Sequence, residues 1–159
     1  MSERERLQTL MSEIGPLIDG IEAIDQEDDD FWLFALGDNV VLQIQHDEEA
    51  RKLVFSTELG TPPTERRLEA YEALLAFNYL WLETGGVRMA IESPGGEVTQ
   101  VMDLFTLDLD ISTLATVIQN FREKAIHWRG YLANFPAGDA EDSRPTSFGD
   151  GTGGPAIRV

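Results

Sequence analysis

The sequence predicts one α+β domain in the order helix, three strands, helix, two strands, helix, with an antiparallel sheet and packed helices. Apolar residues recur with helical spacing in three segments, and they alternate with polar residues in the stretches between. Clusters of Gly, Pro, Asn and Asp separate these segments. A chain of 159 residues can bury a core without disulfides or metal ions, so one domain is the simplest organisation.

A short amphipathic helix is predicted first, because apolar side chains follow helical spacing between residues 7 and 14. Ser2 and Glu5 have the spacing of a capping box, which satisfies free amide groups at the start of a helix. Gly15 and Pro16 then end the helix.

Three strands are predicted next, at residues 31–36, 40–45 and 52–59. The first is a short aromatic run, and the other two alternate between apolar and polar residues, as half-buried strands do. Two polar turns join the three into an antiparallel meander. The acidic residues 27–30, just before the first strand, are expected to form a solvated loop.

A second helix is predicted from Glu65 to about Glu83, with Thr64 in position to cap it and two glycines, 85 and 86, to end it. Its second half is apolar nearly all round. A helix of this kind must be covered on both faces, so we expect the sheet on one side and a second subunit on the other.

A hairpin with strands at 87–92 and 98–104 is predicted to follow. A long amphipathic helix capped by Asp110 or Ser112 then closes a domain of residues 1–135. Residues 136–159 are rich in Gly, Pro, Ser, Thr and Asp and lack apolar periodicity, so we expect a flexible polar tail.

The charge of the chain excludes several classes of partner. With 29 acidic and 12 basic residues the net charge is −17, which disfavours nucleic acid and anionic membranes and favours a basic or mixed-charge partner. The chain has no cysteine, so thiolate chemistry is excluded. No signal-peptide pattern and no apolar run long enough for a bilayer are present, so we expect a cytoplasmic protein without membrane insertion.

No motif predicts catalysis or a cofactor. The acidic run at 27–30 lacks the spacing of a calcium loop, and the glycine-rich stretch at 149–154 follows no strand and contains no Lys. His46 and His127 stand in no ligand or nucleophile spacing. We therefore expect no catalytic residue, no metal and no cofactor. An enzyme using the acids at 28–30 or 103–110 remains the alternative that metal binding would test.

The strands carry an unusual excess of apolar side chains. Phe31 to Phe34 supply bulk to both faces of the sheet, and Val41 and Val54 interrupt a face that is otherwise polar. Cover by the first helix is one explanation. The other is an exposed groove for an extended peptide.

The order of elements, the length and the acidity resemble the type III secretion chaperones of the Tir chaperone, or CesT-like, family. The resemblance covers roughly residues 3 to 135. It is carried by the second helix, Leu74 to Leu80, by the sequence Thr84-Gly85-Gly86, and by the strand from Val98 to Leu104. It implies a homodimer that holds the N-terminal chaperone-binding segment of an effector in extended form, without nucleotide or metal.

On this basis the sequence predicts two sets of contact residues. Effector contact is expected at Leu7, Leu10, Met11, Trp32, Phe34, Val41 and Val54, and dimer contact at Tyr71, Leu75, Tyr79, Leu82 and Met89. A face assigned from alternation inverts if the register slips by one residue. The rival interpretation is a regulatory or scaffold protein of similar fold, such as the YbjN-like group, which has no secretion client.

Overall fold

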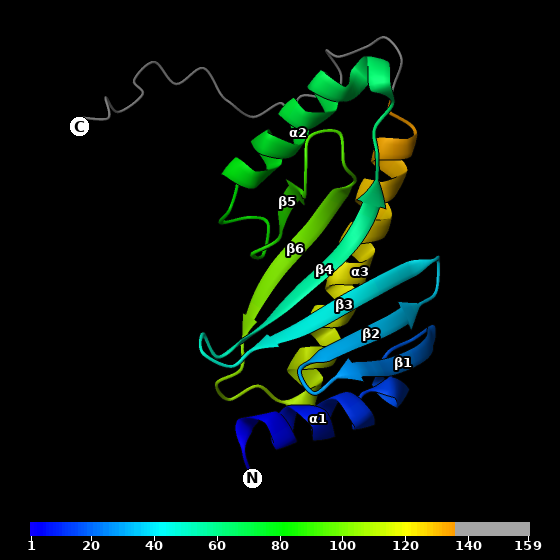
Figure 1. The fold of residues 1–159 in the computed structure, drawn as a ribbon. Coiled ribbons are helices and arrows are strands. Elements are labelled where there is room, and N and C mark those ends of the chain that lie inside the picture. Colours follow the sequence, from blue (N-terminus) through cyan, green and yellow to red (C-terminus); the bar gives the residue numbers. More distant parts are fainter. Residues whose placement is uncertain (136–159) are drawn as a thin grey trace, which may run out of the picture.

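A six-stranded antiparallel sheet forms the centre of the computed structural model, which describes residues 1–135 (Figure 1). The strand order is β1-β2-β3-β4-β6-β5, so β1 and β5 are the two edges. The predicted tail, residues 136–159, lies outside the described residues. The elements in chain order are α1 (Glu3–Glu13), β1 (Ile21–Asp28), β2 (Phe31–Leu36), β3 (Val40–Asp47), β4 (Lys52–Gly60), α2 (Arg67–Tyr79), β5 (Arg88–Ile91), β6 (Val98–Phe105) and α3 (Ile111–Ala133).

One face of the sheet carries the hydrophobic core. The long helix α3 crosses behind the strands, α1 lies beside β1, and α2 lies beside β5 (Figure 1). The rings of Phe55 on β4 and Phe121 on α3 are 6.0 Å apart at the centre of this layer. Buried side chains of β2, β3 and α1 belong to the same cluster. The fold is therefore a sheet with one packed face and one face left to other contacts.

Alternation and capping signals specified most of these elements correctly. Buried and exposed residues alternate along β3 and β4 in the predicted phase. Ser2 and Glu5 form the predicted capping box at the start of α1, and the Asp110 carboxylate accepts a hydrogen bond from the Thr113 amide at the start of α3, at 2.7 Å. The α+β class and the antiparallel sheet are as predicted.

The structure adds a strand that the sequence did not predict. Residues 21–28, for which no strand was predicted and whose last two acidic residues were expected in a loop, form β1, which pairs with β2 along its length. Only Ile21 and Ile24 are half-buried on this strand, and the other side chains are exposed. An edge strand with so few buried residues has no clear apolar alternation, which explains why it was missed.

Helix α2 is shorter than predicted at both ends. A 3-10 turn, Thr64–Arg66, precedes it, and no side chain caps its start. It ends at Tyr79, four residues before the predicted end, and a tight turn follows. Thr84 is held in that turn by the Leu80 carbonyl and by Lys124, whose Nζ donates to the Thr84 carbonyl at 2.7 Å. The turn brings Val87 back to the sheet edge, where its side chain is buried.

Candidate functional site

An open groove runs between α1 and the free edge of β1. Its volume is about 1120 Å³, and Glu5, Gln8, Thr9 and Ser12 form the α1 wall. Gln26, Glu27, Asp28 and Asp29 form the opposite wall, with Met1 at one end. The lining therefore combines four carboxylates with small polar side chains, and it contains no Lys or Arg.

The β1 wall of this groove belongs to an edge strand, and the carbonyls of Asp28 and Asp29 accept hydrogen bonds there from the side chains of Gln26 and Gln8. Within residues 1–135, β1 is hydrogen-bonded to β2 alone, so its other edge has no strand partner. The register with β2 shifts twice along β1, at 21–23 and 26–28. Bulges and charges are the usual means by which an edge strand avoids random association. The register shifts and the acidic side chains therefore restrict which chains can pair with this edge.

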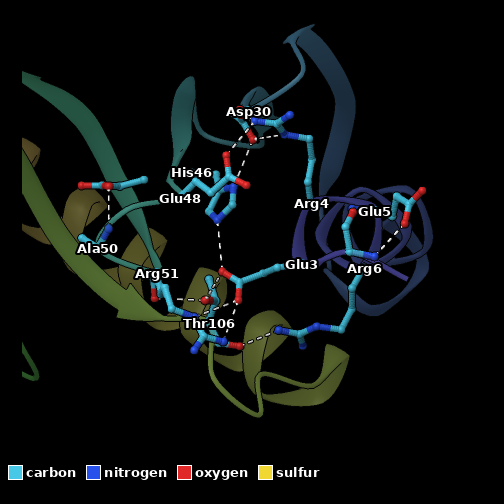
Figure 2. A network of polar contacts seen from close by, with 12 residues as sticks. Glu3, Arg4, Glu5, Arg6, Asp30, His46, Glu48, Ala50, Arg51 and Thr106 are labelled. Carbon is cyan, nitrogen blue, oxygen red and sulfur yellow. Dashed lines mark hydrogen bonds and ion pairs between the residues drawn. The ribbon is translucent and has the colours of Figure 1, made fainter.

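A polar network fixes the α1 wall to the rest of the domain (Figure 2). The Arg4 guanidinium donates two hydrogen bonds to Asp30, at 3.0 and 2.7 Å. Glu3 accepts from Arg51 at 2.9 Å and from the Thr106 hydroxyl at 2.8 Å. The buried ring of His46 lies between the two carboxylates. The sequence had indicated no role for this histidine.

The network keeps both central carboxylates ionised. The hydrogen bond from Thr106, followed by those from Arg51 and His46, lowers the pKa of Glu3 from 4.5 to about 2, against the opposing effect of burial. The hydrogen bonds from Arg4 first, and then from His46, lower the pKa of Asp30. The first turn of α1 is thus joined to the β1–β2, β3–β4 and β6–α3 connections by charged contacts.

The predicted effector-contact residues do not all reach the surface. Leu7, Met11, Trp32 and Phe34 are 0–1% exposed and belong to the core, so they offer a partner no surface. Trp32 pairs with Ile44 and Phe34 with Leu42, which places both on the packed face. For β2, the assigned face was displaced by one residue. Three predicted residues remain accessible: Val41 at 50% exposure, with Val54 and Leu10 half-buried.

Sequence reasoning missed the residues that accompany these valines on the open face. Phe31 pairs with Gln45, which pairs with Val54, and Ala35 pairs with Val41. Phe31 and the neighbouring Leu33 are therefore on the open face and half-buried. The signal was present in the turn: Leu36 and Val40 flank three residues and pair directly, which fixes which side chains share a face.

Charged pairs and a shallow hollow complete this open face. Asp103 accepts from Lys52 at 3.1 Å and from Arg88 at 3.0 Å. Near the other end, Glu58 borders a hollow of about 310 Å³ across β3, β4, β5 and β6. The neighbouring Glu97, and to a smaller extent Glu92, raise the pKa of Glu58. The face is therefore mixed in character, with apolar strips between charged groups.

A second exposed apolar surface lies on α2 and the turn that follows it. Leu75, Tyr79 and Leu82, all predicted for dimer contact, are 67–78% exposed. Of the other two predicted residues, Tyr71 is half-buried and Met89 is buried at 7%. Met89 is covered because it pairs with the buried Gln100 on the packed face of the sheet. The Asn78 side chain makes two hydrogen bonds to the Met89 backbone, at 2.8 and 2.9 Å, and holds α2 against β5.

Exposed neighbours extend this surface beyond the predicted residues. Leu68 and Trp81 are 72% and 70% exposed, and a cleft of about 160 Å³ lies between α2 and β5. Apolar patches of this kind usually mark contacts with another protein. We call the surface formed by Leu68, Leu75, Tyr79, Trp81 and Leu82 the α2 patch.

The acidic loops have structural partners. Asp30 and Asp103 are in ion pairs, and Asp110 caps α3. Within residues 1–135, no three His, Asp or Glu side chains are grouped in a way that could hold a metal ion. No helix in the described part of the chain is both long and apolar enough to cross a bilayer.

The domain thus presents an open sheet face, an acidic groove and an exposed apolar helix patch, and patches of the last kind usually mark contacts with other proteins. Residues 19–129 match the Tir chaperone protein (CesT) family, and the chain belongs to that family. This is a family of type III secretion chaperones and not of enzymes. No curated protein matches the chain in sequence.

Solved structures show the same fold at low sequence identity. A chain of the HopA1–SchA chaperone–effector complex is 15% identical, with a TM-score of 0.65 over 80% of this chain and 95% of that one. The Yersinia pestis type III secretion chaperone SycH, solved with a fragment of YscM2, is 19% identical, with a TM-score of 0.57 over 80% and 99%. YbjN from E. coli is 12% identical, with a TM-score of 0.59 over 82% and 92%.

Proposed function

We propose that this protein is a type III secretion chaperone that holds the N-terminal chaperone-binding segment of an effector in extended form. The observation that carries the proposal is the free β1 edge beside the α1–β1 groove. An extended segment that enters the groove can pair with β1 through its backbone, and the two walls can receive its alternate side chains. Family membership supports the chaperone role, and the geometry supports the extended form of the client.

The acids of the groove favour a client segment with Lys or Arg residues. Glu5, Glu27, Asp28 and Asp29 line the groove without a basic counterpart. A basic segment gains from these charges, whereas an acidic one is repelled. The contribution of exposed charges declines as salt rises, so capture of the client is expected to weaken in high salt.

The open face of the sheet gives an extended client further contacts. Val41 and Val54 present apolar side chains there, together with Phe31 and Leu33. A segment without stable tertiary structure can wrap over such a surface, and many small contacts then offset the cost of ordering it. Leu10, half-buried on α1, is the remaining contact residue that we retain.

We also propose that two chains pair through the α2 patch. Its five large apolar residues are 67–78% exposed, which is unfavourable in an isolated subunit. A second copy related by a twofold axis would cover the patch with the same residues, since a twofold interface is self-complementary. The protein would then act as a homodimer of about 35 kDa, twice the 17.7 kDa chain.

The sequence match to a family, and not the fold, distinguishes the chaperone role from the regulatory alternative. YbjN superposes as well as SycH does, with TM-scores of 0.59 and 0.57, so fold likeness cannot decide between the two roles. The family match over residues 19–129 favours the chaperone role. A regulator without a client would leave the groove unused.

The test is co-purification with the polypeptides encoded beside its gene. The tagged protein is co-expressed with the N-terminal portion of each neighbour, and the complexes are analysed by size-exclusion chromatography with light scattering. Retention of one neighbour at a fixed stoichiometry supports the proposal. If every neighbour is lost, the chaperone function of this chain is refuted and the regulatory role is favoured.

A matched pair of variants locates the contact. Ser12 lines the groove, and Glu13, beside it on the exposed surface of α1, does not. Ser12→Trp should fill the groove and abolish capture, whereas Glu13→Trp should preserve it. Val41→Asp should weaken capture through the open face. Equal capture by both tryptophan variants would exclude the groove as the binding site.

A further inference from the structure

His46 is the buried centre of the network that holds the first turn of α1. Its side chain is 0% exposed. The Nδ1 atom lies 3.0 Å from Asp30 Oδ1, and the Nε2 atom lies 3.3 Å from Glu3 Oε1. Figure 2 shows the ring between these two carboxylates, which come from the β1–β2 turn and from α1. Both ring nitrogens are therefore directed at groups that can only accept hydrogen bonds when ionised.

Only a ring with a proton on each nitrogen can donate a hydrogen bond to both carboxylates. A neutral imidazole carries one N–H and one lone pair, whereas an imidazolium donates from both nitrogens. Both carboxylates are held in the ionised form, because hydrogen bonds lower the pKa of Glu3 and of Asp30. A neutral ring would direct its lone pair at one of these anions.

The ring stands among charged groups. Three carboxylates take part, those of Glu3, Asp30 and Glu48, together with the guanidinium groups of Arg4 and Arg51. The Thr106 hydroxyl donates to Glu3, and a third guanidinium group, that of Arg6, donates to the carbonyls of Thr106 and Leu109.

We propose that His46 is a proton-dependent positioning residue that holds the first turn of α1, and with it one wall of the α1–β1 groove, in place. Loss of the second ring proton breaks the contact to Glu3 or to Asp30 and directs a lone pair at that carboxylate. Leu7 and Met11 stay buried, so α1 remains on the sheet while its first turn loosens. The consequence for client binding rests on the proposed function, but the movement of α1 does not.

The test makes two measurements, NMR and hydrogen exchange, across one pH series on the full-length protein. NMR of the imidazole carbons follows the protonation of each histidine, and hydrogen exchange measures protection of the α1 amides from Arg6 onward. The series continues upward until the His46 ring is neutral. Protection factors, corrected for the intrinsic exchange rate, should fall about tenfold or more in step with the His46 titration, as loss of a charged buried hydrogen bond predicts.

The two histidines of the chain supply the controls. His127 is exposed and outside the network, so His127→Gln should preserve the pH dependence of α1 protection. His46→Gln keeps one donor but cannot titrate, so it should give weaker protection that no longer varies with pH. Protection that is constant while His46 titrates, or a pH profile retained in His46→Gln, would overturn the proposal.

Capture of a client is measured in a separate experiment. A neighbour retained by the wild-type protein should be released over the same pH range, and His46→Gln should remove that dependence. If α1 responds to pH and no neighbour is ever captured, the proposed function fails while the positioning role stands. If a client is captured and α1 protection does not change with pH, the positioning role fails alone.

Discussion

Replacement of Glu3 should remove stability in a way that depends on pH. The Glu3 carboxylate accepts hydrogen bonds from Thr106, Arg51 and His46, which lower its pKa from 4.5 to about 2. A difference of this size between the folded and unfolded states corresponds to at most about 3 kcal/mol of folding free energy. The side chain keeps 19% of its exposure, so water screens part of this, and we expect about 1–2 kcal/mol.

The sign follows from the direction of the shift. The folded pKa lies below the unfolded one, so the contribution is fully present above the unfolded value of about 4.5 and is lost as the pH falls toward 2. Glu3→Gln should therefore lower the free energy of unfolding at pH 7 and have a smaller effect at pH 3.5. This acidic range is separate from the range in which a histidine ordinarily titrates.

The assay is urea unfolding of the wild type and the variant at pH 7 and pH 3.5, at one protein concentration, since dimerisation would affect the midpoint. Glu13→Gln, on the exposed end of the same helix, serves as the control. A Glu3→Gln midpoint that equals the control at pH 7 would refute the reasoning. A deficit as large at pH 3.5 as at pH 7 would show that the loss is steric and not electrostatic.

Three further predictions concern the remaining parts of the molecule. Leu75→Asp combined with Tyr79→Asp should convert the proposed dimer of about 35 kDa into a monomer in light scattering, because buried charges oppose an apolar interface. Asn78→Ala should cost about 1–3 kcal/mol in urea unfolding, since it leaves the Met89 amide and carbonyl without their partner. Phe121→Ala should cost about 3–5 kcal/mol in the same assay, because it opens a cavity against Phe55.

Each of these predictions has an outcome that contradicts it. An unchanged mass for the double variant would exclude the α2 patch as the dimer contact. Ile126 on α3 is 37% exposed, so Ile126→Ala serves as a mild control on the same helix. If Phe121→Ala and Ile126→Ala lowered the free energy of unfolding equally, the core position of the Phe121 ring would be contradicted. Unaltered stability in Asn78→Ala would mean that α2 is held to β5 by apolar packing alone.

The sequence predicted the strands and helices in which buried residues recur with the period of the element. Along β3 and β4 every second side chain enters the core, so the alternation in the sequence gives both the strand and its phase. The same holds for α3, where the buried residues recur every three or four positions. Cap signals at Ser2 and Asp110 then fixed the starts of two helices.

The unpredicted part lies where burial is slight. β1 holds its place through backbone pairing with β2, and its acidic side chains give no alternation from which a strand could be recognised. β2 carries large apolar residues on both faces, so alternation alone could not distinguish Trp32 and Phe34, in the core, from Phe31 and Leu33 on the open face. His46 was dismissed because its partners are 16 and 43 residues away in sequence.

These omissions share a physical origin that bears on function. A surface that receives an extended partner must leave backbone edges and apolar strips unsatisfied by its own chain, and such features contribute little regular signal to the sequence. Three such features lie at the end of the sheet that forms the groove. They are the free edge of β1, the apolar residues of β2 on the open face, and the polar network that holds the first turn of α1. By contrast, Leu75, Tyr79 and Leu82 of the α2 patch were predicted to be at a contact surface, because a helix apolar on two faces leaves a clear excess in the pattern. The sequence therefore indicates the proposed dimer surface directly, and the proposed client surface mainly through apolar and backbone groups that the core does not use.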